Sequence, residues 1–247
     1  NAALVNTQGG GIHAINTGDL PLAARSANGD IDVRTADSAV AGGAGGNIVV
    51  NTVSGLSGVS TTGTGNVSLS AGAGAAGLFL NGAGGSVSVL ATSTAAGELT
   101  LTAGNGGSGL STHEPVPTQV LAGGGGGNIT ASAALSASGS LALTAGQGGQ
   151  GSDVSGTRIG PFSAGAGGAG GTLTATATLT AGVDVTLRAG SAGRGGGASF
   201  PFTNVAAGTG GVGGSITTSA AVMAGRDVVI ASGDGAHGRT GAQTLGS

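Results

Sequence analysis

Six polar residues recur at one point of a repeated pattern, and their spacing could support chemistry. Each lies directly before an alternating apolar segment: Asp30, Asn66, Glu98, Ser140, Asp184 and Asp227. If these segments stack in register, the six side chains form one column. Glycoside hydrolysis uses two carboxyl groups about 5–9.5 Å apart, but here Asn and Ser interrupt the acids and no Lys, Tyr or His joins them. We interpret the column as a solvated polar ladder, with calcium or carbohydrate contact and catalysis as the alternatives.

Metal and cofactor motifs are weak throughout the chain. His13, His113 and His237 stand far apart without a second ligand at zinc spacing, so we expect them in solvated loops. The chain has no Cys, which excludes disulfides and thiolate metal sites. The Gly-rich tracts lack the Lys-Ser/Thr pair of a phosphate-binding loop. We therefore predict no catalytic, metal or cofactor site and no enzyme activity.

Composition excludes further classes. The chain has 58 Gly among 247 residues, a net charge of −3, and seven basic residues that are all Arg and scattered. A nucleic-acid-binding surface would need a basic stripe, so we predict no nucleic-acid partner. No apolar run approaches the roughly 18 residues of a membrane helix, so we predict no membrane span. We expect the chain to be a mature product or an excised piece, because it lacks an initial Met and a leader-like segment.

The elements that would position the ladder come from a repeat of about 40 residues. A first segment follows a Gly pair, and its apolar anchors are Ile48, Val87, Ile129, Leu173 and Ile216, which are 39, 42, 44 and 43 residues apart. A second segment follows, and its apolar side chains alternate with polar ones. This period of two predicts strands with one apolar face. We predict one repetitive domain, 1–247, with units near 1–46, 47–85, 86–127, 128–171, 172–214 and 215–247.

Stacked coils would close a thin core of Val, Ile, Leu and Ala. The fold prediction is therefore all-β, a right-handed parallel β-helix or β-solenoid. We expect Leu173, Val185, Leu187, Ile216 and Val228 all to be buried. Near the N-terminus the apolar anchors recur at about half the spacing of a full unit, at Ile12, Ile31, Ile48, Val67 and Val87. This shorter rhythm predicts that one coil takes about half of a unit.

Two Gly-rich pieces complete each unit, for example AGNGGSG after a second strand and AGGGGGN before a first strand. Gly at two of three positions leaves a face without side chains, which permits close approach of backbones. We predict that these pieces pack as polyglycine II rods with three residues per turn. Flexible surface loops are the alternative.

The strand segments LTAGVDVTLRAG, VMAGRDVVIASG, GSLALTAG and GELTLTAG resemble the haemagglutinin-type repeats of filamentous haemagglutinin and related two-partner-secreted exoproteins. The likeness covers about half of the chain. It implies a right-handed parallel β-helix, export to the cell surface, and adhesive or structural work without catalysis. The Gly-Gly-X-Gly-Gly tracts depart from that pattern and are similar to polyglycine segments of mycobacterial Gly-rich surface proteins and of some phage tail-tip adhesins.

The excursions between Gly tracts carry the large apolar side chains. We identify Phe79, Phe162, Phe200, Phe202, Ile159 and Val205 as candidate contacts with other subunits or a ligand. The alternative is that these tips fold back and cap the Gly layer.

These patterns together predict a non-enzymatic structural or adhesive protein at the cell surface or outside the cell. The expected partner is a second copy, in an oligomer or filament, or adjoining repeats of a longer chain, together with a surface glycan or receptor. The alternative is an ice- or carbohydrate-binding solenoid that uses flat Thr-bearing strands, such as Thr172, Thr174, Thr176, Thr178 and Thr180. A regular Thr grid would favour recognition, whereas a mixture of Thr, Ser, Asn and Arg favours a structural role.

Overall fold

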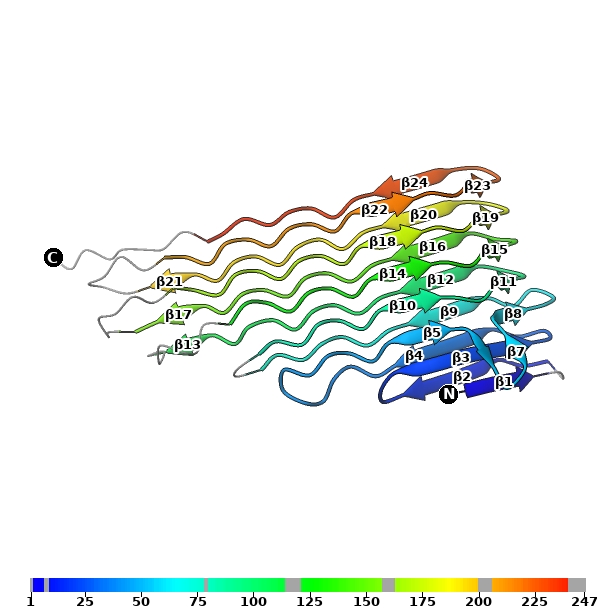
Figure 1. Ribbon diagram of the computed structural model, residues 1–247, viewed down its shortest axis with the longest axis horizontal. Coiled ribbons are helices and arrows are strands. Elements are labelled where there is room, and N and C mark those ends of the chain that lie inside the picture. Colours follow the sequence, from blue (N-terminus) through cyan, green and yellow to red (C-terminus); the bar gives the residue numbers. More distant parts are fainter. Residues whose placement is uncertain are drawn as a thin grey trace.

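A computed structural model describes residues 2–6, 9–77, 80–113, 121–156, 163–199 and 206–239. This part of the chain is all-β, and its sheets are parallel except for one small antiparallel pair. It contains no helix that could cross a membrane. The arrangement is compatible with a β-solenoid, because successive segments of the chain stack on one another in the same order (Figure 1).

Strands of the 12-stranded sheet form two columns that β3 (Leu20–Ser26) joins, because it pairs with strands of both. The first column holds β5 (Ile48–Val50), β10 (Val87–Val89), β14 (Ile129–Ala131), β18 (Leu173–Ala175) and β22 (Ile216–Thr218). The second column holds β8 (Val59–Thr61), β11 (Ser93–Ala95), β15 (Leu135–Ala137), β19 (Leu179–Ala181) and β23 (Val222–Ala224), and β1 (Ala2–Asn6) pairs with β3.

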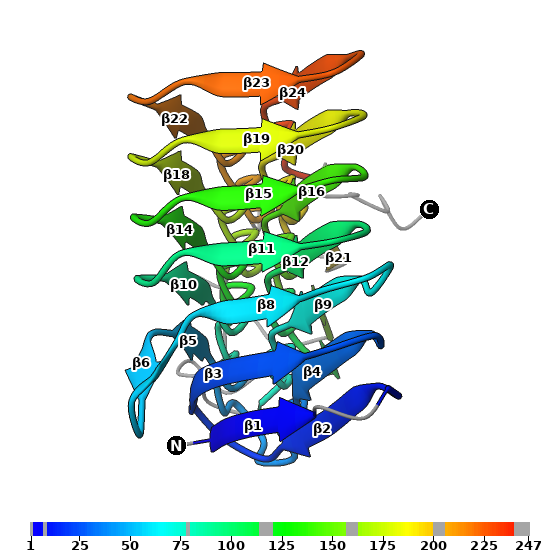
Figure 2. The same cartoon turned by 90° about the vertical axis from the view of Figure 1, so that its right-hand side faces the viewer.

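A 7-stranded sheet forms the opposite wall, and Figure 2 shows it to the right of the two columns. Its strands are β2 (Ile12–Asn16), β4 (Ile31–Thr35), β9 (Val67–Ser70), β12 (Leu99–Thr102), β16 (Leu141–Thr144), β20 (Val185–Arg188) and β24 (Val228–Ala231). A 3-stranded tip sheet holds β13 (Thr112–His113), β17 (Val154–Ser155) and β21 (Ala198–Ser199). The antiparallel pair is β6 (Thr52–Val53) with β7 (Leu56–Ser57).

The core lies between these sheets and follows the predicted alternation. Leu173, Val185 and Leu187 are fully buried, as expected from the sequence. Ile216 is only partly buried, and Val228 is 46% exposed, so the expectation that both would be buried is wrong. Both lie in the last coil, where no further coil covers their upper side.

The register shows how long one coil is. Ile12 pairs with Ile31, the next anchor of the short rhythm, whereas Ile129 pairs with Leu173, the equivalent anchor of the next full unit. Each long repeat is therefore one wide coil, and the prediction of a coil of half a unit holds only for the first step. The short rhythm misled because Ile48 lies in the first column and Ile31 lies in the 7-stranded sheet.

The Gly-rich tracts run between the sheets and the tip in two groups (Figure 1). We call 71–77, 103–109, 145–151, 189–196 and 231–238 the outgoing tracts, because they follow strands of the 7-stranded sheet. The returning tracts are 80–85, 121–127, 164–171 and 206–214, which lead into first-column strands.

Backbone hydrogen bonds join the tracts with a period of three residues. Gly106 N–H donates to the Gln147 carbonyl oxygen in the next outgoing tract, at 2.8 Å. Gly107 N–H donates to the Gly82 carbonyl oxygen in a returning tract, also at 2.8 Å. The third residue of each triplet is exposed, as Asn105 is, or partly exposed, as Ser191 is. The tracts thus form two hydrogen-bonded layers whose third positions face outward.

Close approach explains why Gly predominates at the other two positions. A Cβ on Gly104 would lie 1.8 Å from the Gly72 carbonyl oxygen, and a Cβ on Gly146 would lie 1.8 Å from that of Gly104. A Cβ on Gly125, a third-position residue, would meet only the Ala169 carbonyl oxygen, at 3.9 Å. Glycine therefore packs best at most inner positions, although Ala75, Ala192 and Ala236 also lie at inner positions, and it is dispensable at the outer one.

Candidate functional site

The six predicted ladder residues do form one column, at the start of strands in the 7-stranded sheet. Backbone hydrogen bonds join them in order. The residue after each ladder member donates its N–H to the carbonyl oxygen of the ladder member one coil further on, as Leu141 does to Asp184 at 2.8 Å. Side chains add a second link at some steps. The Asp30 Oδ1 accepts the N–H of Asn66 at 2.7 Å, and the Asn66 Oδ1 accepts that of Glu98 at 2.7 Å. These oxygens therefore satisfy backbone donors and are not aimed at a common substrate position.

The acidic end of this ladder is neutralised by an arginine. The Arg226 Nε donates to the Asp184 Oδ1 at 2.9 Å, and its Nη2 bonds to the Asp184 Oδ2. The hydrogen bond from Arg226 lowers the pKa of Asp184, and the same contact raises the pKa of Arg226. Asp184 thus stays ionised and paired, which is the opposite of what a general acid requires.

A second ladder at the start of the first column went unrecognised in the sequence. The Asn47 Oδ1 accepts the N–H of Ser86 at 2.7 Å, and the Asn128 Oδ1 accepts that of Thr172 at 2.8 Å. The Ser86 Oγ accepts the N–H of Asn128 at 3.0 Å, which completes a continuous series. The available signal was a side chain with an acceptor oxygen between each Gly pair and each apolar anchor.

The three histidines lie on different elements of the structure. His13 and His113 lie in β2 and β13, so the expectation that they lie in loops is wrong for both. His13 Nδ1 is 3.7 Å from the Asp32 Oδ2, and both side chains are partly solvated. Within the described ranges, no group of three or more His, Cys, Asp or Glu residues is placed to hold a metal ion.

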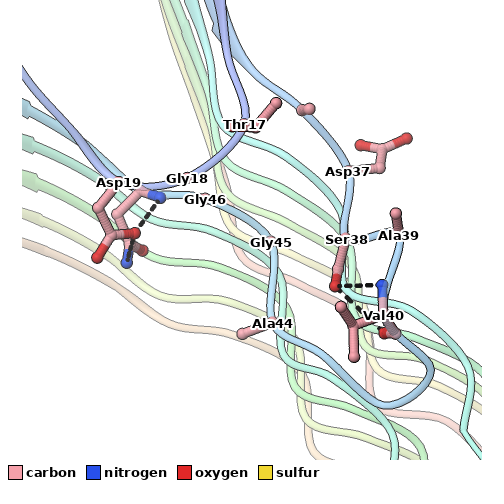
Figure 3. Close-up of a pocket in the computed structure, with 12 residues that line it drawn as sticks. Thr17, Gly18, Asp19, Asp37, Ser38, Ala39, Val40, Ala44, Gly45 and Gly46 are labelled. Carbon is pink, nitrogen blue, oxygen red and sulfur yellow. Dashed lines mark hydrogen bonds between the residues drawn. The ribbon is translucent and has the colours of Figure 1, made fainter.

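A hollow of about 420 Å³ lies beside the first Gly-rich loop (Figure 3). It exists because 17–19 turn directly from β2 to β3, so no tract packs against 36–46 from that side. Its two carboxylates already accept backbone hydrogen bonds, Asp19 from Asn47 at 2.9 Å and Asp37 from Ala73 at 2.7 Å. The hollow therefore lacks the convergent polar groups of a small-molecule site.

The outward faces of the strand columns carry mixed side chains. Register places Val49, Ser88, Thr130, Thr174 and Thr217 in one line on the first column. On the second column, Thr180 is followed by Met223. Under the criterion drawn from the sequence, this mixture favours a structural role over recognition by a Thr grid.

Among the described residues, no coil lies above the end face that β22, β23 and β24 form. In the coil below it, Val185 N–H donates to the Asp227 carbonyl oxygen at 2.9 Å. The equivalent N–H groups at this end belong to Ile216 in the first column, Val222 in the second column and Val228 in the 7-stranded sheet. They have no acceptor among the described residues. This face therefore presents strand edges of the kind that pair with another chain.

The candidate apolar contacts lie outside the described residues: Phe79, Phe162, Phe200, Phe202, Ile159 and Val205. No protein-family model, curated protein or solved structure matches the chain. The resemblance to haemagglutinin-type repeats therefore stays a prediction.

Proposed function

We propose that this chain is a non-enzymatic structural or adhesive element of an extracellular or cell-surface fibre, in which coils stack within the chain and between copies or onto adjoining repeats of a longer chain. The observation that carries the proposal is the C-terminal end face. Its strands present N–H groups that bond to no described residue, beside apolar side chains that are half exposed. An open edge of this kind that meets a different surface of the next copy produces a filament.

The apolar side chains of the end face support the same conclusion. Val228 pairs with Val185, and Ile230 pairs with Leu187 in the coil below. Val185 and Leu187 are fully buried, whereas Val228 and Ile230 are 46% and 54% exposed. A further coil would bury them. Burial of one such side chain contributes about 1.5–3 kcal/mol, so several together would stabilise a joint between copies.

The opposite end supplies strand partners for such a joint. β2 ends the 7-stranded sheet there, and β1 pairs only with β3. Stacking copies head to tail would set β24 against β2 and β23 against β1. The N-terminal coil passes from β2 to β3 through 17–19 and has no Gly tract there. The strands would therefore form the contact between copies, because the last returning tract would have no tract to pair with.

Within this proposal the chain is a right-handed parallel β-helix of the haemagglutinin-repeat type, extended by polyglycine II layers. The parallel register supports the β-helix, and the three-residue period of the tract hydrogen bonds supports the polyglycine II geometry.

Proline at the end face tests the proposal. Val222→Pro with Val228→Pro removes two N–H groups that bond to no described residue, so folding should change little while stacking is blocked. Val229→Thr, in the same strand with its N–H kept, is the matched control. We expect wild type and the control to form fibres by electron microscopy and light scattering, and the proline variant to form none. A wild type that shows no fibres and no end-to-end growth at high concentration would refute the proposal.

A further inference from the structure

The two layers of Gly tracts have outward faces of opposite chemistry. Third-position residues of the outgoing tracts are Ala73 and Ala76 in the first tract and polar or charged in nearly every later one: Asn105, Gln147, Ser191 and Asp234 in one line, which Asp37 of the first loop begins, and Ser108, Gln150, Arg194 and His237 in the next. Third-position residues on the returning side carry no charge: Ala44 in the first loop, Ala83, Gly125, Ala169 and Val212 in one line, and Ala122, Ala166 and Thr209 in the next. Of these eight, only Thr209 has a polar side chain.

Both faces are exposed, so the difference is not a difference between surface and core. On the returning face Val212 is 72% exposed, and Leu80, three residues before Ala83, is 69% exposed. The open position of a Cβ on Gly125 shows that the third positions point away from the opposite layer. We call this surface the returning face.

Hydrogen bonding differs in the same way. On the outgoing face, a side chain accepts the third-position N–H above it at three steps: Asp37 for Ala73 at 2.7 Å, Asn105 for Gln147 at 2.8 Å, and Ser108 for Gln150 at 3.1 Å. On the returning face, Ala and Gly offer no acceptor, and the N–H groups of Gly125, Ala169 and Val212 bond to no described residue. Nothing in the stacking of coils explains an apolar surface here, because the same layer chemistry tolerates Gln and Asn on the other side.

The size of the returning face fits a protein contact. The four returning tracts and 43–46 of the first loop together hold 34 residues. At about 3.1 Å per residue and about 4.8 Å between coils, they give a flat surface of roughly 500 Å². Two copies would bury about 1,000 Å² in total, which is the size of a weak or transient specific interface. Patches of this size on soluble proteins mark interaction sites.

We propose that the returning face is the contact between two copies of this chain, packed face to face. Small side chains make the surface flat, without a hollow for a large anchor of a different partner, and without charge it is complementary to itself. A two-fold pair buries the same residues from both copies. This side-by-side contact goes beyond end-to-end stacking and is independent of it.

The test uses the Val222→Pro, Val228→Pro background, so that side-by-side pairing is read without end-to-end growth. Sedimentation velocity should show a dimer. Adding Ala122→Glu with Ala169→Glu puts two exposed acids on the returning face and should weaken the dimer about 100-fold or more, because like charges would face each other across it. Gln147→Glu with Gln150→Glu adds the same charge to the outgoing face and should leave the dimer intact.

Crosslinking is a second test of the contact, and it needs only one substitution in each variant. The chain lacks Cys, so Gly125→Cys carries one thiol at the centre of the returning face, and Gln147→Cys carries one on the opposite face. A short bis-maleimide should join two copies of the first variant and not of the second. Equal crosslinking of both variants, or a dimer that tolerates the Ala122 and Ala169 changes, would overturn the proposal.

The remaining outcomes separate this proposal from the proposed function. A dimer in a protein whose wild type forms no fibres would leave the face-to-face contact standing and remove the fibre function. A monomer that binds neutral phosphatidylcholine vesicles through the returning face, with no dimer at any concentration, would assign that face to a lipid surface and refute pairing.

Discussion

Replacing Gly146 by Ala tests whether close packing of the tracts holds the Gly layers together. The new Cβ would lie 1.8 Å from the Gly104 carbonyl oxygen, whereas real contacts stay above 3.0 Å, so the two outgoing tracts must move apart by the difference between these two distances. The two backbone–backbone hydrogen bonds that flank the substitution and join these two coils run from Ala103 to Thr144 at 2.9 Å and from Gly106 to Gln147 at 2.8 Å. Stretching them by that difference breaks both.

The expected cost follows from these losses. Two hydrogen bonds at about 1 kcal/mol each, plus about 1–3 kcal/mol for overpacking, give a loss of about 3–5 kcal/mol in the free energy of unfolding. Gly125→Ala is the matched control, because its Cβ meets only one atom, at 3.9 Å. That variant should be neutral or about 0.4–1 kcal/mol more stable, since Ala restricts the unfolded chain.

Urea unfolding followed by far-UV circular dichroism measures both variants, and hydrogen exchange of the tract amides locates the change. Gly146→Ala should lower the midpoint and deprotect the amides of 103–109 and 145–151, while Gly125→Ala should do neither. Equal midpoints for the two variants would show that the layers yield without cost, and the account of Gly at the inner positions would be wrong.

Three further predictions concern the core, the ladders and their charge. Leu143→Ala removes a fully buried side chain between β12 and β20 and should cost about 2–5 kcal/mol in the same urea assay, whereas Val228→Ala at the open end should cost clearly less. Asn128→Ala removes the acceptor for the Thr172 N–H and should cost about 0.5–1.5 kcal/mol, while Asn128→Ser, which keeps an acceptor oxygen, should retain most of that stability. Arg226 lowers the pKa of Asp184, so their pairing contributes stability above about pH 4, and this contribution is lost as the pH falls through the lowered pKa. Arg226→Gln should therefore remove part of the acid-dependent loss of stability, and an unchanged pH profile would contradict this assignment.

Local sequence determined the strands, because alternation is a property of neighbouring residues. The alternation over Leu173 to Leu187 predicts which side chains face inward. The structure buries Leu173, Val185 and Leu187, but Val183, between β19 and β20, is 36% exposed, so the alternation holds within the strands and fails at the turn between them. The polar residue before each strand of the 7-stranded sheet was also recognisable, since it recurs at a fixed distance from the apolar anchor. Gly at two of three positions marked the tracts for the same reason.

Neighbouring residues could not predict the length of one coil or the exposure of apolar side chains in the last coil. Ile31 and Ile48 look like successive steps of one series, but tertiary pairing sends Ile31 to Val67 and Ile48 to Val87. Val228 has the sequence context of a core residue and is exposed only because no coil lies above it.

The sequence by itself determined the period of two in the strands and the Gly spacing in the tracts, because both are set by the backbone geometry of single segments. The tertiary structure decided which segments meet. Only stacking turned Asn47, Ser86 and Asn128 into a continuous ladder. Only the two-layer packing of the tracts separated Gln147 from Ala169, and so created one polar and one apolar face from similar Gly-rich sequences. These outcomes depend on contacts between residues a whole coil apart in the chain, which no local pattern specifies.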